Sequence, residues 1–484
     1  MEALLPISAD AKPSPARSST GASAPTAATA NAPSVILPMA FALTGMAALL
    51  FGMGWLTVRP SLLATYHYNQ SVIAATHLFV LGWICTVVMG SMYQLVPVAL
   101  ETRLYSERLA AVQFLCHVVG FIGMVLMFST WNMKQVGHFG SLLTFGVGLF
   151  VYNLGRTLKR VPKWNVTASA VLAALIWISL TVLAGLSIAT AKCAFEAMSE
   201  SDAPASPFLH GLRSVAGFVA RFDAISAMHA HAHLGVVGCF TMLIVGVSYK
   251  LIPMFTLSEV QSRRRAAWSI GLLNIGLIGT FLTVLLRSPW KLASGLVIVG
   301  ALALYGWELF AILRPRKRKA PDWGIKYFLT AVALFAPLAV LGIVLTWPGL
   351  PLTPFTGQLE NVYGFLGIVG VVTLAIIGML YKIIPFLVWF GRYSKHVGRA
   401  RVPALADLYS GRVQAAGYFL YLGGLAVTIA GSLWQSEILV RCGCGLLTLS
   451  AVSLAWNVGI MLSHFLNPKV QPLWTPSTNK SNSI

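Results

Sequence analysis

Apolar residues fill runs of about 20 residues along almost the whole chain, which is the length an α-helix needs to cross a bilayer. Polar or basic stretches separate these runs. Apolar and polar residues do not alternate within them, as they do in the strands of a membrane β-barrel. The pattern therefore predicts an all-α integral membrane protein with twelve transmembrane helices, at residues 36–57, 72–98, 110–129, 137–158, 167–190, 225–254, 266–286, 291–313, 325–347, 360–390, 411–433 and 437–464.

One 21-residue frame occurs three times within these runs. It consists of His, Gly at +5, Gly at +13, Tyr at +16 and Pro at +20, and a Phe replaces the His in the third copy. The copies are His77, Gly82, Gly90, Tyr93 and Pro97; His233, Gly238, Gly246, Tyr249 and Pro253; and Phe365, Gly370, Gly378, Tyr381 and Pro385. They fall in the second, sixth and tenth spans. The frame therefore predicts three pseudo-symmetric four-helix arcs, at about residues 35–160, 165–315 and 325–466.

The frame residues also have structural explanations. Glycines allow helices to approach closely, or leave room for a flat ligand against the backbone. The tyrosine resembles an interfacial anchor, and the proline resembles the end of a span.

The chain outside the spans divides into two tails and one long connection. Residues 1–34 are rich in Ala, Ser, Pro and Thr and have no apolar core, so we expect a disordered cytoplasmic tail rather than a signal peptide. Residues 467–484 form a second predicted cytoplasmic tail, and the membrane domain is predicted at 35–466. The stretch around 191–224 is expected to be a long outer connection.

Composition supports a membrane protein, and the charge distribution orients it. The chain is 57% hydrophobic and only 10% charged, with a net charge of +20. The basic residues crowd into connections after even-numbered spans, at 156–163, 263–265, 314–319 and 392–401. This positive-inside pattern predicts a multi-pass protein of a bacterial inner membrane with both termini cytoplasmic. Its expected partner is the lipid bilayer, with its anionic headgroups, and not nucleic acid.

Candidate chemistry is concentrated in His229-Ala-His231-Ala-His233, where the sixth span begins. Ionisable residues within a membrane are costly and usually functional. Successive residues of an α-helix rotate by about 100°, so His229 and His233 share a face and His231 points away from both. The arrangement suits two sites on opposite sides of one helix.

Two axial ligands of one haem iron must come from different helices at a common depth. His77 and His233 hold equivalent frame positions, and we expect them to be that pair. His231 would be the sole protein ligand of a second haem. The alternative for each of them is a hydrogen-bonded packing role. Further candidates near such a site are His229, His67 and Arg221, with Arg213 and Arg59 as other partners for haem propionates; His117 is expected to be a packed histidine, and His210, His396 and His464 to be solvated.

These residues carry a resemblance to a known family. His231-Ala-His233-Leu-Gly-Val-Val-Gly, followed by Gly246, Tyr249 and Pro253, is similar to a motif of cbb-type cytochrome c oxidase subunit I, in the haem–copper oxidase superfamily. In that family the first motif histidine binds the high-spin haem, and the second binds the low-spin haem together with a histidine of the second span. The resemblance implies these roles for His231, His233 and His77. It covers all twelve spans, although its specific motifs lie in three.

The chain also departs from that family. The family has the H-x-H pair on the tenth span, where this chain has Asn361, Tyr363 and Phe365. No His-His dipeptide occurs, so no three-histidine copper site is recognisable and copper binding stays open. Glu308 is the clearest acidic residue within a span. Membrane haem–copper proteins of the nitric-oxide response, which also lack a complete oxidase site, are a comparable group.

The sequence therefore favours a stand-alone haem-binding membrane protein in electron transfer or in oxygen or nitric oxide chemistry. If it is an enzyme, we expect a haem-dependent oxidoreductase. One or two haems would be b-type or similar, because no C-x-x-C-H attachment motif is present. Cytochrome c or other respiratory subunits are the expected protein partners. The alternatives are a non-catalytic haem or copper sensor or assembly protein, and a transporter of metals or small molecules, which the clustering of the histidines at one depth disfavours.

Overall fold

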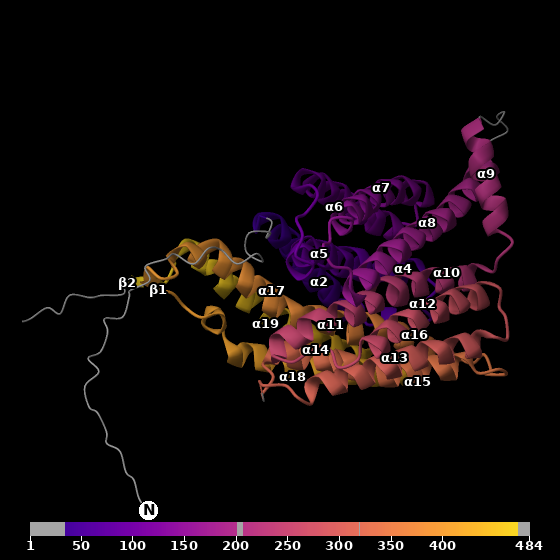
Figure 1. Ribbon diagram of the computed structural model, residues 1–484. Helices are drawn as coiled ribbons and strands as arrows, with labels where there is room; N and C mark the ends of the chain where they lie inside the picture. The colour runs from indigo at the N-terminus through magenta and orange to yellow at the C-terminus, as the bar shows by residue number, and fades with distance from the viewer. Residues whose placement is uncertain (1–33, 201–206, 319, 473–484) are drawn as a thin grey trace, which may run out of the picture.

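The computed structural model describes residues 34–200, 207–318 and 320–472, and these are almost entirely helical (Figure 1). The long helices lie side by side in an elongated bundle, with α9 at one end and the short strands β1 and β2 at the other. β1 (Ala400–Arg401) pairs antiparallel with β2 (Gln471–Pro472), which ties the described part of the predicted 467–484 tail to the bundle. The predicted tail at 1–34 lies outside the described residues, apart from Ser34.

Helices occur at all twelve predicted positions. The α-helices of the first half of the chain are α2 (Ile36–Val58), α3 (Ser61–Ala64), α4 (Gln70–His77), α5 (Thr86–Ala99), α6 (Glu107–Ser129), α7 (Met133–Leu158), α8 (Val166–Glu200) and α9 (Pro207–Val219). The remainder are α10 (Ala224–His233), α11 (Met242–Thr256), α12 (Arg263–Leu285), α13 (Lys291–Leu313), α14 (Trp323–Ala333), α15 (Phe335–Thr346), α16 (Pro354–Phe365), α17 (Leu374–Tyr393), α18 (Gly411–Leu433) and α19 (Glu437–Leu466). Single 3₁₀ turns, η4 (Ser394–His396) and η5 (Leu405–Leu408), connect α17 to α18.

Eleven helical segments in the described part of the chain are long and apolar enough to cross a membrane. This supports a multi-pass membrane protein. α7 is equally long and packs between α6 and α8, but it is not among the eleven. Its polar residues, such as His138 and Asn153, lower its mean hydropathy.

Much of the predicted long connection around 191–224 is helical. α8 continues as one helix to Glu200, well beyond the predicted end of the fifth span, and α9 occupies most of the rest. Ala, Lys and Glu are good helix formers, and the stretch after residue 190 is rich in them, so the helix need not end where the apolar run ends.

Each copy of the frame contains a π-helical segment. η1 (Leu78–Cys85), η2 (Leu234–Thr241) and η3 (Leu366–Thr373) begin directly after the first frame residue and join α4 to α5, α10 to α11 and α16 to α17. A π-helix is rare, occurs often at functional sites, and leaves backbone carbonyls without their usual partner. The frame therefore marks one backbone distortion that occurs three times.

Side chains of the neighbouring helices satisfy carbonyls in two of these π-helical segments. Nε2 of His117 lies 3.1 Å from the Leu81 carbonyl oxygen, and the Tyr421 hydroxyl donates to the Val369 carbonyl over 2.6 Å. Leu81 and Val369 both stand four residues after the first frame residue. His117 is thus a packed histidine, as expected, with a definite structural role.

The glycines, tyrosines and prolines of the frame serve packing. A Cβ on Gly246 would lie 2.0 Å from the Ala170 side chain, and one on Gly90 would lie 2.3 Å from Phe41. The interpretation of the tyrosines as interfacial anchors is wrong, because Tyr249 is only 3% exposed and hydrogen-bonds Ser269 of the next helix. The prolines lie near the ends of α5 and α11, which stop at Ala99 and Thr256, whereas α17 continues past Pro385 to Tyr393.

A serine caps the helix that follows each frame, and an acceptor on the next helix binds the N–H of that serine. The caps begin α6, α12 and α18, and the acceptors lie on α7, α13 and α19. The pairs are Ser106 with Asn153 (3.1 Å), Ser262 with Glu308 (2.8 Å) and Ser410 with Asn457 (3.0 Å). Glu308 therefore anchors a helix start, and it also accepts from Arg265 over 2.7 Å.

Candidate functional site

The candidate histidines line one large cavity at the α9 end of the bundle. Its volume is about 1580 Å³, and its walls are mainly apolar and aromatic side chains. Pockets for single drug-sized ligands typically measure about 300–1,000 Å³, so this cavity has room for more than one such ligand. The five histidines in its lining are His67, His77, His229, His231 and His233.

His77 lies at the end of α4, with its ring beside Phe128 and the ring centroids 4.6 Å apart. Its Nδ1 donates to the carbonyl oxygen of Ile73 over 2.8 Å. This hydrogen bond places the proton on Nδ1 and leaves a lone pair on Nε2. Among the described residues no hydrogen-bond partner is found for that Nε2.

His233 repeats this arrangement at the equivalent frame position. Its Nδ1 donates to the carbonyl oxygen of His229 over 2.7 Å, which again leaves Nε2 with the lone pair. Here the Tyr363 hydroxyl, 3.3 Å away on α16, donates to Nε2. Histidine ligands of metals usually have their second ring nitrogen fixed in this way, so both rings have the tautomer of an Nε2 ligand.

His231 faces a different neighbour, as the helical rotation predicts. Its ring lies against α8 at Gly185, where a Cβ would come within 2.8 Å of the ring carbon Cε1. Its Nδ1 is buried and has no hydrogen-bond partner among the described residues. The backbone of Thr181, also on α8, and the ring of His77 both lie near this imidazole. The glycine thus creates the space that this histidine occupies.

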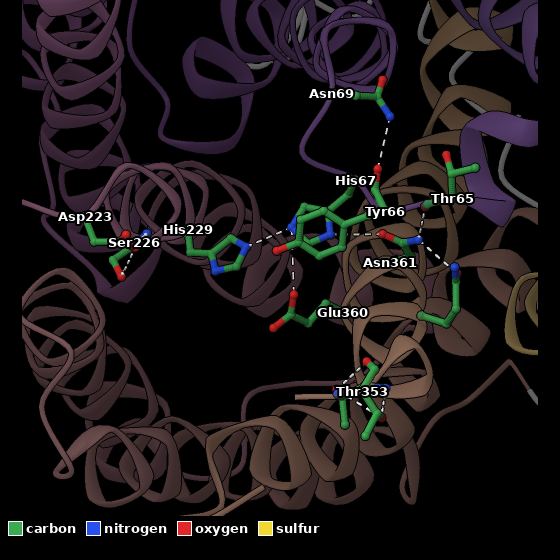
Figure 2. Close-up of polar contacts among 12 residues, drawn as sticks. Thr65, Tyr66, His67, Asn69, Asp223, Ser226, His229, Thr353, Glu360 and Asn361 are labelled. Atoms are coloured by element: carbon green, nitrogen blue, oxygen red, sulfur yellow. Dashed lines mark hydrogen bonds and ion pairs between the residues drawn. The ribbon is translucent and has the colours of Figure 1, made fainter. Parts of the chain in front are cut away.

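His67, His229, Glu360 and Asn361 form a polar cluster at one side of the cavity (Figure 2). Nε2 of His67 lies 3.1 Å from Nε2 of His229 and 3.9 Å from a carboxylate oxygen of Glu360. Nδ1 of His67 lies 3.0 Å from Oδ1 of Asn361. Burial lowers the pKa of His67 below its usual 6.5, and the hydrogen bond to Asn361 opposes that shift.

Side-chain caps fix the starts of the helices that carry these residues. Asn69 accepts from the Val72 N–H at the start of α4, and Asp223 accepts from the Ser226 N–H at the start of α10. Thr353 forms a capping box with Thr356 on α16. Such caps satisfy N–H groups that a helix leaves free in its first turn. The Ser226 N–H and hydroxyl also lower the pKa of Asp223.

Cationic side chains also line the cavity. Arg213 is among them, and its Nε is buried without a hydrogen-bond partner in the described residues. Arg221 and Arg59 are exposed and are not part of the lining. Sequence reasoning missed Lys192, Arg287 and Lys291, which lie in the lining; their position beside predicted outer connections was the available signal.

The remaining histidines lie away from the cavity. His138, His210 and His396 are exposed. The expectation that His464 is solvated is wrong: it is 3% exposed, and its Nδ1 lies 2.7 Å from the Tyr393 hydroxyl. The last turn of α19 packs beside α17, which removes this side chain from solvent.

A scan of the chain against models of protein families finds no match, and a search among curated proteins finds no significant relative.

Proposed function

We propose that this chain is a haem-binding integral membrane protein of a bacterial inner membrane, in electron transfer or in oxygen or nitric oxide chemistry. One observation supports this best. His77 and His233, at equivalent positions of an internal repeat, line the same cavity with the same Nδ1-to-carbonyl hydrogen bond, four residues back along their helices.

The environment of these rings fits haem chemically. A haem is a large, flat and mainly apolar ligand with an iron that prefers imidazole nitrogen and with two anionic propionates. The cavity offers apolar walls, the imidazole of His77 with a free lone pair on Nε2, and the cationic groups of Arg213 and Arg287.

The proposed roles come from the internal repeat and from the family resemblance. His77 and His233 would together hold the iron of a low-spin haem, and His231 would hold the iron of a second haem. Bound haem would supply an iron that changes redox state and, where one axial position is open, binds diatomic gases. Arg213, with its unpartnered Nε, would pair with a propionate.

The proposed topology has twelve spans. They are the eleven long apolar helical segments together with α7, which is the fourth span along the chain. α7 packs against α6 as α13 packs against α12 and α19 against α18. The recurring serine caps and π-helical segments support three four-helix arcs, similar to subunit I of the haem–copper oxidases. Both termini would be cytoplasmic, because the basic clusters lie at the end of the bundle opposite the cavity.

A non-catalytic haem sensor or assembly protein would use the same binding residues. The lack of a His-His dipeptide, and with it of a recognisable three-histidine copper site, favours this second candidate. Turnover of oxygen or nitric oxide by the haem-loaded protein would separate the two.

The test is the absorption spectrum of the purified protein, oxidised and dithionite-reduced, with a pyridine haemochrome assay. We expect a Soret band and a b-type haemochrome with one or two haems per chain. A preparation that stays colourless after expression with ample haem would contradict the proposal.

A further inference from the structure

The cluster of His67, His229 and Glu360 brings three metal-ligating groups together from three separate parts of the chain. One ligand atom of each lies within 4.8 Å of the other two. His67 precedes α4, His229 lies on α10 and Glu360 on α16, so tertiary packing alone creates the cluster (Figure 2).

The hydrogen bonds of Asn361 determine the tautomer of His67. Nδ2 of Asn361 donates to the carbonyl oxygen of Thr65 over 2.6 Å and to Oε1 of Gln358 over 2.9 Å. Its Oδ1 must therefore face His67 and accept a proton from Nδ1. Nε2 of His67 then carries a lone pair and points toward His229 and Glu360.

Two electron-rich atoms thus face each other in this cluster. Nε2 of His67 and the carboxylate of Glu360, 3.9 Å apart, can both only accept. Without a bound ion, Nε2 of His229 donates to Nε2 of His67, and the carboxylate gains nothing from either ring. In the described residues no Lys or Arg forms a direct ion pair with Glu360, although the charge of Lys291 acts on this carboxylate from farther away. A cation between the three groups would bind the lone pairs of His67 and Glu360, and that of Nε2 of His229 once the proton there has moved to Nδ1.

We propose that His67, His229 and Glu360 bind one divalent first-row transition-metal ion of the zinc class, apart from any haem. The proposal does not rest on haem binding, because none of these side chains is assigned to haem iron.

The distances suit such an ion. With metal–nitrogen bonds of about 2.05 Å, the 3.1 Å between the two Nε2 atoms corresponds to an angle of roughly 98° at the metal. That angle lies between octahedral and tetrahedral values. The Glu360 oxygen lies 3.9 Å from Nε2 of His67, about 0.6 Å beyond tetrahedral spacing, and within 4.8 Å of a ring nitrogen of His229. This side chain is 31% exposed and can rotate to bring its oxygen closer to both rings. Two histidines and one carboxylate leave open positions for water or a substrate.

Asn361 would act as a positioning residue. It holds the imidazole of His67 in the orientation and tautomer that metal binding requires. Hydrogen-bond acceptors on the second ring nitrogen usually do this for metal-bound histidines. Asn361 occupies the third-frame position that matches His229 in the second frame. The same frame position therefore provides a proposed metal ligand, His229, in the second copy. In the third copy it provides Asn361, the hydrogen-bond partner of another proposed ligand, His67.

The experiment is equilibrium dialysis of the purified, chelator-treated full chain, without a polyhistidine tag, against Zn²⁺ at neutral pH. We expect one tightly bound Zn²⁺ per chain. His67→Ala and His229→Ala should each lower the affinity by more than 100-fold, and Glu360→Gln should lower it less. His138→Ala is the matched control, because His138 is exposed and away from the cavity; it should bind as the parent chain does.

Asn361 provides a second measurement that does not remove a ligand. Asn361→Leu should lower Zn²⁺ affinity by about 10–100-fold. Asn361→Asp, which keeps an acceptor for Nδ1 of His67, should bind Zn²⁺ about as tightly as the parent chain does. Co²⁺ in place of Zn²⁺ should give visible absorption bands that His67→Ala changes. Unchanged Zn²⁺ binding in the three ligand variants, or an equal loss in His138→Ala, would overturn the proposal. The haem spectrum of the same preparations should stay unchanged, so failure here and failure of haem binding are separate results.

Discussion

Tyr363 donates its hydroxyl proton to Nε2 of His233 over 3.3 Å, and the two rings stack with their centroids 6.0 Å apart. Tyr363 holds the position in the third frame that His231 holds in the second. The hydroxyl therefore occupies the one lone pair with which His233 could bind iron. Haem binding at His233 requires this hydrogen bond to break.

Tyr363→Phe should therefore strengthen haem binding at the His77–His233 site. The variant removes a hydrogen bond worth about 1 kcal/mol, which corresponds to less than a tenfold gain in affinity. Titration of haem-free protein with haem, followed at the Soret band, measures the change. Weaker binding in Tyr363→Phe would mean that the tyrosine supports the ligand instead of competing with it.

Gly185→Ala should displace His231 without disturbing His77 or His233. The new Cβ would come within 2.8 Å of the His231 ring, which is closer than real contacts allow. We expect loss of the high-spin signal in the electron paramagnetic resonance spectrum, with the low-spin signal retained. Gly148→Ala is the control, because its Cβ would meet open space. Loss of both signals in Gly185→Ala would argue against two separate sites.

The cap of α10 should give the protein an acid-sensitive stability. The Ser226 N–H and hydroxyl stabilise the charged form of Asp223 and lower its pKa below the usual 3.8. Its contribution is fully present above pH 3.8 and is lost as the pH falls through the lower, native-state pKa. Melting temperatures between pH 7 and pH 2.5 should therefore fall less steeply in Asp223→Asn than in the parent chain. Identical pH profiles would show that this cap does not contribute.

Glu308→Ala should destabilise the protein strongly. The carboxylate is fully buried and accepts from Arg265 and from the N–H groups of Gln261 and Ser262. Removing one partner of a buried ion pair costs about 3–5 kcal/mol. Denaturant unfolding in detergent should show a loss of that order, and Glu259→Ala, at an exposed position, should show almost none. A loss below about 1 kcal/mol would contradict the anchoring role.

The apolar runs predicted the helices well, because burial in lipid imposes a long and uniform pattern. Helix ends were predicted less well, since α8 continues past its apolar run on residues that favour helix without being apolar. The π-helical segments were not predicted, although the frame marks their position. Hydropathy does not reveal which carbonyl loses its partner, so the donors His117 and Tyr421 were not recognised either.

The candidate site was predicted only in part. The frame brought out His77 and His233, and helical rotation separated His231 from them. The contact of His67 with His229 and Glu360 could not be predicted, because these residues lie far apart in the chain and share no motif. The sequence singled out Glu308 as an acidic residue within a span but did not predict its role. Its carboxylate accepts a hydrogen bond from the N–H of Ser262, the cap of α12, 46 residues earlier.

The most direct test of the central claim is the low-spin haem signal of His77→Ala and His233→Ala. Reduced-minus-oxidised absorption and electron paramagnetic resonance spectra should show that each variant loses it, whereas His231→Ala and the exposed control His138→Ala retain it. Retention of the signal in His77→Ala or in His233→Ala would contradict the proposal that these two repeat-related histidines bind one iron.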